Sequence, residues 1–495
     1  MKSSILTIDI GTSSCKAVLF SETGKVIAQG RGQYELLFPE KGRVEQDPEE
    51  IFAGVGYAVQ EISKNGGDLR SVNAISFSAQ MSSQFLVDRR GKPLTRLISW
   101  MDGRAQEETE EFTRHFSDAQ IRELTGVDMV VTPAYSISKL YWMKRHIPEL
   151  VEKAGYFVQI KDYVIYQMTG EWVSDPTSLK GLIHQQTEKP VLEIFQFIGV
   201  SPKLLPEVRK PYEIAGRLRE QVPGFEGIPA GIPVVTGWND MNAAFLGMGA
   251  LADGCVGLDI TGTSEHLGCV CHEKAIPPEE YEGVNRVPFL GDREAFYGVT
   301  SSGGQAVEWF VKDFMGQPGV PDYFEKLLSA EKDVQIADEN RPVFLPYIEG
   351  ERNPWNNPDA RGVFFGLNRS HRQIDVALSV LEGVCFALKA IEERLPVKPE
   401  YFVVSGGASV NDLWNQMKAD VMNIPFARLE NAEAGCAGAE ILAMMALKPE
   451  RSLEDIIKTA VRKQKIYQPD EKRHECFEKR YRKFIRLYDA LEKLF

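Results

Sequence analysis

The stretch that decides the fold is Leu6–Phe20, LTIDIGTSSCKAVLF. Apolar residues run into Asp9 and resume after Lys16, a pattern typical of two strands joined by a turn. The turn is made of small and hydroxyl-bearing residues: Gly11, Thr12, Ser13 and Ser14. Exposed backbone N–H groups and hydroxyls suit an anion such as phosphate. Asp9 has the wrong charge for that partner unless a divalent cation lies between them, and a polar β-turn with a solvated aspartate is the alternative interpretation.

A second stretch has the same order of features. Residues 256–270, VGLDITGTSEHLGCV, again run from an apolar strand through an aspartate, Asp259, into a Gly-Thr-Ser turn and a second strand. The two aspartates lie about half the chain apart. Two similar hairpins at this spacing predict a duplicated domain, whose turns could hold a polyphosphate from both sides.

Composition limits the classes of protein that need to be considered. The 495 residues are enough for two or more domains, and 43% hydrophobic with 26% charged residues is ordinary for a globular protein. A net charge of −13 argues against a nucleic-acid or anionic-membrane partner. The N-terminus lacks the apolar region of a signal peptide, and no run of 18 apolar residues occurs, so we expect a soluble cytoplasmic protein.

The seven cysteines form no CxxC pair and are typical of reduced core residues. Cys269 and Cys271 share one strand face near His266 and His272, but no second pair with metal-ligand spacing follows, and ordinary strand and turn residues are the favoured interpretation.

The remaining segments predict an α/β protein. Strand-like runs (residues 73–79 and 156–160) alternate with helical ones (51–62 and 134–147) in the N-terminal half. In the second half, glycine pairs open helices in the segments 300–310 and 400–425, a long polar loop covers 346–367, and a packing helix follows residue 469. The sequence GMGALA at 247–252 fits a dinucleotide fingerprint but follows a helical stretch rather than a strand, and no GxxxxGK[ST] loop occurs.

Taken together, these motifs resemble those of the FGGY carbohydrate kinases, most closely their xylulokinase-like branch, over about residues 5–447. The segments that carry the resemblance are DIGTSSCKAVLF, SAQMSSQFLVD, ISWMDGR, SISKLYWMKRH, TGWNDMNAA, DITGTS, GERNPWNNPDARGVFFGL and SGGASVNDLWNQMKAD, in the family's order. The resemblance implies two ribonuclease-H-like (actin/hexokinase-type) domains, with ATP in the cleft between them. Residues 1–246 would form the sugar-side domain and residues 247–495 the nucleotide-side domain.

The resemblance also implies a catalytic base, Asp240. A sugar hydroxyl is a poor nucleophile at neutral pH, so a carboxylate must accept its proton as the phosphoryl group moves. The alternative role for Asp240 is the N-cap of the following helix. Asp9, together with Asp240, would hold hydrated Mg²⁺, which usually keeps several waters and uses one or two carboxylates plus phosphates.

Residues that match the family's nucleotide-binding positions are Thr12, Ser13, Ser14, Lys16, Gly262, Thr263, Gly304, Glu308, Gly407 and Asn411. Residues that match its sugar-binding positions are Gln80, Met81, Ser82, Trp100, Asp102, Arg104 and Met241. For Trp100, Asp102 and Arg104 the alternative is a surface turn with an internal salt bridge.

The resemblance is weakest at the substrate. Xylulokinases carry Gln-Met-His where this chain has Gln80-Met81-Ser82. The expected activity is therefore ATP-dependent phosphorylation of a small carbohydrate, with a pentulose such as D-xylulose as the first candidate and gluconate or another ketose or polyol as the alternatives. A chaperone-type or binding ATPase of actin-like fold is the competing class, but it would have no reason to carry Met81, Trp100 and Arg104. The expected partner is a small-molecule sugar, and a homodimer is one candidate assembly.

Overall fold

The computed structural model describes the chain except for residues 1–2, 128–129, 252–254, 273–280 and 331–333 and the side chains of residues 321–322. The chain forms two compact units. The first comprises Met1–Gly247 and Glu433–Val461, and the second comprises Met248–Ala432 and Arg462–Phe495. The expected ranges are 1–246 and 247–495; in the structure Gly247 and residues 433–461 belong to the first unit.

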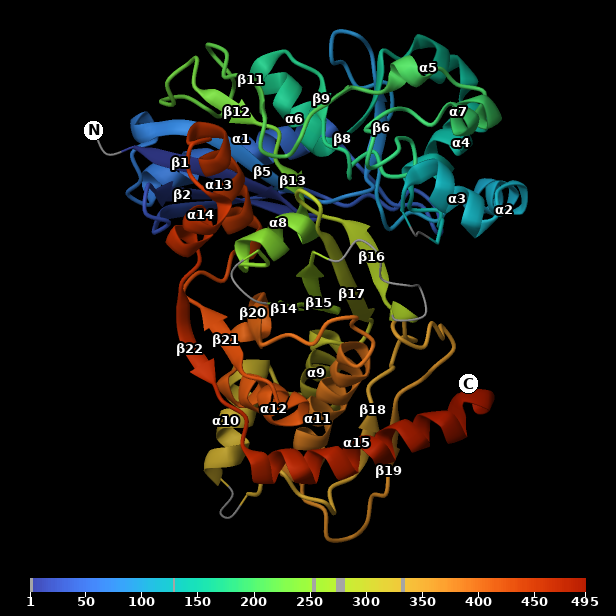
Figure 1. Cartoon of the computed structure of the whole chain (residues 1–495), viewed down its shortest axis with the longest axis vertical. Helices are drawn as coiled ribbons and strands as arrows, with labels where there is room; N and C mark the ends of the chain where they lie inside the picture. The colour runs from blue at the N-terminus through green and yellow to red at the C-terminus, as the bar shows by residue number, and fades with distance from the viewer. Residues whose placement is uncertain (1–2, 128–129, 252–254, 273–280, 331–333) are drawn as a thin grey trace. The chain divides into compact units, whose positions relative to one another are not determined.

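The first unit is built on a seven-stranded sheet of order β11-β12-β5-β1-β2-β3, with β13 also paired to β5 (Figure 1). Its strands are β1 (Ser4–Ile10), β2 (Ser14–Ser21), β3 (Val26–Gln33), β5 (Val72–Ala79), β11 (Ile214–Arg217), β12 (Pro233–Val235) and β13 (Trp238–Asn239). The predicted hairpin is confirmed, since β1 and β2 pair antiparallel with Ile10 opposite Cys15. Every residue of β1 is buried except Asp9, which is partly exposed.

A smaller sheet of order β4-β7-β6-β8 and a set of helices complete this unit. The strands are β4 (Glu45–Gln46), β6 (Gln84–Val87), β7 (Leu97–Ile98) and β8 (Tyr156–Gln159), and β9 (Val173–Ser174) pairs separately with β10 (Glu207–Val208). The helices are α1 (Pro48–Lys64), α2 (Gln106–His115), α3 (Asp118–Thr125), α4 (Ser136–His146), α5 (Pro148–Lys153), α6 (Ile160–Thr169), α7 (Leu192–Ile198), α8 (Asp240–Gly247), α13 (Ala434–Leu447) and α14 (Leu453–Ala460).

Helices α8 and α13 cross at very short range, and this contact returns residues 433–461 to the first unit. A Cβ atom at Gly438 would lie 1.8 Å from the carbonyl oxygen of Ala243, and one at Gly247 would lie 2.1 Å from that of Ala434. Only glycine allows two helix backbones to approach so closely. Helix α13 also contacts β5 and β1, so it covers the middle of the sheet.

The second unit repeats the strand plan of the first. Its sheet has the order β16-β17-β15-β14-β20-β21-β22, with strands β14 (Val256–Thr261), β15 (Glu265–Cys271), β16 (Asn285–Pro288), β17 (Glu294–Thr300), β20 (Tyr401–Ser405), β21 (Phe426–Leu429) and β22 (Lys463–Tyr467). In both units the opening hairpin is extended by a third antiparallel strand, two parallel strands follow on the other side, and an antiparallel strand lies beyond them. The predicted duplication is confirmed by this match.

Helices of the second unit pack on that sheet around an aromatic-rich core. They are α9 (Gly304–Trp309), continued by a π-helical turn at Phe310–Phe314, α10 (Val320–Ala330), α11 (Gln373–Glu392), α12 (Asp412–Met422) and α15 (Glu471–Leu491). The long polar loop predicted at 346–367 begins directly after β18 (Val343–Leu345), but its last part contains a strand, β19 (Val363–Phe365). Its Asn353 Oδ1 accepts a hydrogen bond from the Val299 N–H at 2.9 Å, which fastens the loop to β17.

Several smaller expectations can be compared with the structure. Five of the seven cysteines are buried. Helix α8 ends at Gly247, so GMGALA follows a helix rather than a strand, as the sequence indicates; its last residue lies outside the described part of the chain. Among the helices that the structure describes, none is long and apolar enough to cross a membrane.

The close crossing of α8 and α13 yields a stability prediction. Replacing Gly438 by alanine should lower the free energy of unfolding of the first unit by about 3 kcal/mol, because the added methyl group forces the helices apart. Chemical denaturation followed by circular dichroism measures the change. The control is Gly319→Ala, where a Cβ meets no atom within 4 Å; equal stabilities of the two variants would contradict the crossing.

Candidate active site

Strand β5 brings the two predicted acidic residues to one edge of the first sheet. It pairs in parallel with β1 on one side, where Asp9 lies opposite Ser78, and with β13 on the other, where Trp238 also lies opposite Ser78. Asp9 and Asp240 therefore lie at the carboxyl ends of the two strands that flank β5, the edge at which ligands bind in such sheets. The Ser78 hydroxyl donates a hydrogen bond to Asp9 Oδ1 at 2.7 Å.

Asp240 is the first residue of α8 and not its cap. The Asn242 N–H donates to Asn239 Oδ1 at 2.9 Å, so Asn239 fills the capping role that the sequence left open for Asp240. Asp240 Oδ1 accepts only the N–H of Met241, at 2.8 Å, from the residues that the structure describes. The side chain is exposed to solvent.

The surroundings of Asp240 favour its protonated form. Although solvent reaches the carboxylate, the protein encloses it closely enough that loss of hydration, followed by repulsion from Asp9, raises its pKa to about 7. The pKa of Asp9 is also raised, chiefly by burial and partly offset by the hydrogen bond from Ser78. A carboxyl group that gains and loses its proton near neutral pH is suited to general base catalysis.

The first predicted phosphate turn, residues 11–14, is held rigidly. The Gly11 N–H donates to the Ser14 carbonyl at 3.0 Å, and the Tyr34 hydroxyl donates to the Gly11 carbonyl at 2.6 Å. Lys16, which lies opposite Asp9 on β2, forms an ion pair with Glu433 at the start of α13. Glu433 was not predicted as a site residue, because a contact with a residue more than 400 positions away leaves no local signal.

The sugar-side residues Gln80 and Trp100 lie against this turn. Gln80 Nε2 donates to Gln46 Oε1 at 3.1 Å, and Gln46 Nε2 donates to the Thr12 carbonyl at 2.7 Å. The Trp100 indole N–H donates to the Thr12 hydroxyl at 3.0 Å, and 44% of Trp100 is exposed, which leaves its ring accessible to a ligand. Gln46, fully buried, is a further residue that the sequence did not reveal.

Asp102 and Arg104 form an internal salt bridge, as the alternative interpretation had it, but the bridge is buried. Two nitrogens of Arg104 contact the two oxygens of Asp102, each at 2.8 Å, and Nη2 also contacts Glu45 at 2.7 Å. The guanidinium lies 5.0 Å from the centroid of the Trp142 ring. The charges of both residues are thus already compensated within the protein.

Lys139 joins the two sugar-side segments, residues 80–82 and 98–104. Its buried ammonium donates to the backbone carbonyls of Ser82, Ser99 (2.8 Å) and Ile98 (3.3 Å). Burial, opposed by the charge of Asp102, lowers the pKa of Lys139 to about 7. Met81 and Met241 are only partly buried, and Ser82 adopts a left-handed backbone conformation (φ 61°).

In the second unit, one pocket of about 850 Å³ is lined by all six residues predicted there as nucleotide contacts: Gly262, Thr263, Gly304, Glu308, Gly407 and Asn411. Apolar side chains, among them Val307, Phe324 and Leu328, form other parts of its wall. Glycine-rich turns beside an apolar wall suit a ligand with both phosphates and a flat base.

Short backbone contacts shape this pocket. The Gly304 N–H donates to the Gly262 carbonyl at 2.8 Å, where any side chain on Gly304 would collide with that oxygen. Asn411 caps α12 by accepting the Trp414 N–H at 3.1 Å. Glu308 forms an ion pair with Lys312. Lys312 also lines the pocket and was not among the residues predicted from the sequence.

Asp259, the counterpart of Asp9, is fully buried and has a different environment. Lys418 Nζ contacts Asp259 Oδ2 at 2.7 Å and also pairs with Glu265, so one cation holds both ends of the second turn. Burial and repulsion from Asp259 raise the pKa of Glu265 to about 8. Asp259 is therefore a structural residue, and the equivalence of the two hairpins extends to their backbone but not to their carboxylates.

Comparison with known proteins agrees with this arrangement. The model of the N-terminal domain of the FGGY family of carbohydrate kinases matches residues 4–247, and that of its C-terminal domain matches residues 260–447. The chain belongs to the FGGY family of carbohydrate kinases. It is accordingly an ATP-dependent carbohydrate kinase of two-domain, actin/hexokinase-like fold, and the competing class of chaperone-type ATPases is set aside.

Individual relatives differ in their sugars. The chain is 31% identical to a xylulose kinase of Escherichia coli (strain K12) over 98% of both chains, and 30% identical to a gluconokinase of Bacillus subtilis (strain 168) over 90% of this chain and 88% of that one. The crystal structure of a ligand-bound xylulose kinase from Lactobacillus acidophilus superposes with a TM-score of 0.86 at 25% identity, covering 99% of this chain and 98% of that one.

Proposed function

We propose that the protein transfers the terminal phosphoryl group of ATP to a hydroxyl of a neutral ketose, with a pentulose such as D-xylulose as the first candidate, and that Asp240 is the base. The observation that carries the proposal is the state of Asp240. Asn239 caps the helix in its place, and the solvent-exposed carboxylate has a pKa near neutrality. Such a group can accept the proton of the attacking hydroxyl as the bond to phosphorus forms.

ATP is assigned mainly to the second unit and the sugar to the first. ATP would occupy the pocket of the second unit, with its phosphates on the Gly262-Thr263 turn and its base toward the apolar wall around Gly407. The sugar would contact Gln80, Met81, Ser82, Trp100 and Met241 of the first unit. Thr12, Ser13, Ser14 and Lys16 would bind the terminal phosphates, which requires Lys16 to exchange Glu433 for phosphate oxygen.

The residues present fit a magnesium ion held through water. Asp9 accepts one hydrogen bond, from Ser78, which leaves its second oxygen without a partner among the described residues. These residues contain no group of three or more ligands that would enclose a metal, and Mg²⁺ at kinase sites needs only one or two carboxylates besides waters and phosphates. When bound, the ion would neutralise phosphate charge; Asp9 and Asp240 would orient its waters.

The charges of the sugar-side segments favour a neutral sugar over an aldonate. Arg104 is the cation of the predicted substrate set, and both Asp102 and Glu45 already compensate it. The nearby ammonium of Lys139 is buried on three carbonyl groups. A gluconate carboxylate would therefore lose its hydration without gaining a cation, whereas the hydroxyls of a ketose need only hydrogen-bonding partners.

A substrate panel tests the class of sugar. With ATP and Mg²⁺, we expect kcat/KM to be highest for a ketopentose and at least ~10-fold lower for gluconate, since an unpaired buried charge costs more than one lost hydrogen bond. Sugar-dependent ADP release measures both. A clear preference for gluconate would show that the Arg104 pairing opens for substrate, and would select the aldonate kinase.

The base assignment predicts the effect of Asp240→Asn. The amide keeps the size of the side chain but cannot accept a proton, so kcat should fall on the order of 10²-fold or more while ATP binding to the second unit is unchanged. Initial rates and calorimetric titration with ATP measure the two quantities. The matched control is Asp118→Asn, the same change at the first residue of α3, which should leave kcat unaltered; near-normal turnover of the Asp240 variant rejects the assignment.

The raised pKa predicts a dependence on pH. Because a base works when deprotonated, kcat/KM should fall about tenfold per pH unit below pH 7. Asp9→Asn removes the repulsion that helps to raise the pKa of Asp240, so this acid limb should move to lower pH even if the rate itself decreases. A limb that stays in place or moves to higher pH would show that Asp240 is not the group that titrates.

A further inference from the structure

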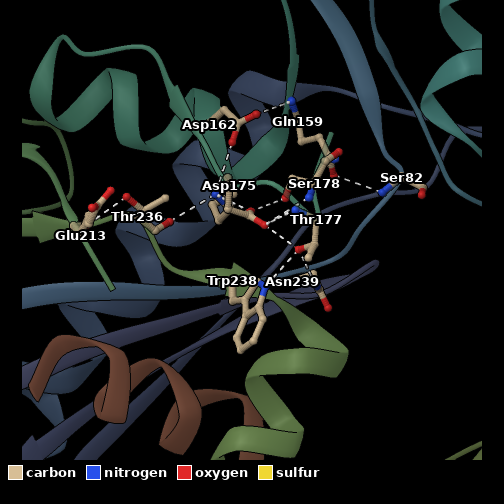
Figure 2. A network of polar contacts seen from close by, with 11 residues as sticks. Ser82, Gln159, Asp162, Asp175, Thr177, Ser178, Glu213, Thr236, Trp238 and Asn239 are labelled. Carbon is tan, nitrogen blue, oxygen red and sulfur yellow. Dashed lines mark hydrogen bonds and ion pairs between the residues drawn. The ribbon is translucent and has the colours of Figure 1, made fainter. Parts of the chain in front are cut away.

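A single threonine connects the anchored loop after β9 to the residues that precede Asp240. Figure 2 shows Thr177 between Asp175 on one side and Trp238 and Asn239 on the other. The Thr177 hydroxyl lies 2.5 Å from Asp175 Oδ1, 3.0 Å from Trp238 Nε1 and 2.7 Å from Asn239 Nδ2. The hydroxyl of Thr177 thus uses its one hydrogen and both of its lone pairs.

The direction of each of these hydrogen bonds is fixed by chemistry. The indole N–H of Trp238 can only donate, so Thr177 must accept from it. Asn239 turns its Oδ1 toward the Asn242 N–H at the start of α8, which leaves its NH₂ group to donate to Thr177. The hydroxyl hydrogen is therefore directed to Asp175, which must be an acceptor.

Asp175 is held in place as an acceptor by its own surroundings. It is fully buried, its Oδ1 also accepts the Thr177 N–H (3.0 Å) and the Ser178 N–H (3.1 Å), and Lys161 Nζ lies 3.2 Å from its Oδ2. Burial by itself lowers the pKa of Lys161. The charges of Asp175 and Asp162 outweigh this effect, so the pKa of Lys161 lies above its ordinary value. The loop at 175–178 is therefore tied to a buried ion pair.

The same loop also supports the sugar-side segment. The Ser178 carbonyl accepts a hydrogen bond from Gln159 Nε2, and Gln159 Oε1 accepts the Ser82 N–H at 3.1 Å (Figure 2). The loop thus contacts the support of the proposed sugar site on one side and the cap of α8 on the other. Asp240, one residue after Asn239, takes its position from that cap.

We propose that Thr177 is a positioning residue for the reaction: its hydroxyl orients the Asn239 amide, which caps α8 and thereby fixes the Asp240 carboxylate toward the acceptor hydroxyl. This inference rests on the proposed role of Asp240 as base. Thr177 does not touch the reacting atoms and acts only through Asn239 and Asp240.

The test compares Thr177→Val, which keeps the shape but removes the hydroxyl, with Thr177→Ser, which keeps the hydroxyl. Thr177→Val should lower kcat ~10-fold or more, because small misplacements of a catalytic group are costly, with little change in the KM for the sugar. Thr177→Ser should restore kcat to within about threefold of the native value. In an Asp240→Asn background, Thr177→Val should cause no further loss, as expected for residues that act as a unit.

Each outcome bears on one assignment. A native kcat in Thr177→Val, or an equal loss with and without Asp240, overturns the positioning role while leaving the base intact; a native kcat in Asp240→Asn alone overturns the proposed base instead. If Thr177→Val does not fold, Asn239→Ser serves in its place. Serine still caps α8 but lacks the side-chain amide that reaches and donates to Thr177, so kcat should again fall ~10-fold, and an unchanged kcat overturns the proposal.

Discussion

The parallel pairing of β5 with β1 and β13 is the constraint on which the first unit's chemistry depends. Because the three strands run in the same direction, they end at one edge, and Ser78 of β5 lies opposite both Asp9 and Trp238. A shift of one residue in either pairing would turn Asp9 into the opposite face or move the start of α8. The buried apolar residues of β1 prevent that shift, since each would lose its place in the core. The position of the two acidic residues is in this sense set by hydrophobic packing.

The two units show how one backbone plan can carry different electrostatics. In the first, the hairpin aspartate remains partly exposed and hydrogen-bonded to a neutral serine. In the second, Asp259 is buried against Lys418, which also contacts Glu265, so removing Lys418 would leave both buried carboxyl groups without a cation. The first arrangement leaves the carboxylate of Asp9 available to a cation from solution. In the second, the carboxylate of Asp259 is occupied by Lys418 and stabilises the turn. Duplication therefore preserved the topology while the charges diverged.

The hairpins and the α/β class could be predicted from the sequence because their signals are local, whereas the two-domain fold and the site residues were implied by the resemblance to the FGGY kinases. Alternating apolar residues marked β1, β2 and β14, and glycine pairs marked the starts of α9 and of the segment before α12. The residues predicted for the second-unit pocket lie close together in three short segments, and the structure gathers all of them. The contacts that could not be predicted join residues that lie far apart in the sequence. Nothing near Glu433 indicates that it pairs with Lys16, and the return of α13 depends on a glycine fitting against the backbone of α8. Capping by Asn239 and burial of the Asp102–Arg104 bridge likewise depend on neighbours that only folding supplies.

The return of residues 433–461 to the first unit also affects how the protein is made. A ribosome completes β1, β5 and α8 early, but the helix that covers them is translated only after nearly all of the second unit. Until then the sheet lacks Cys436 against Val18 and Phe20, and Asp9 and Ser78 lack the close approach of Gly435. The sheet of the first unit therefore remains incompletely covered until α13 is synthesised, while the second unit is being translated. Such a nascent chain exposes apolar surface of the kind that chaperones bind, and the residues of the proposed site reach their final surroundings only when synthesis is almost finished.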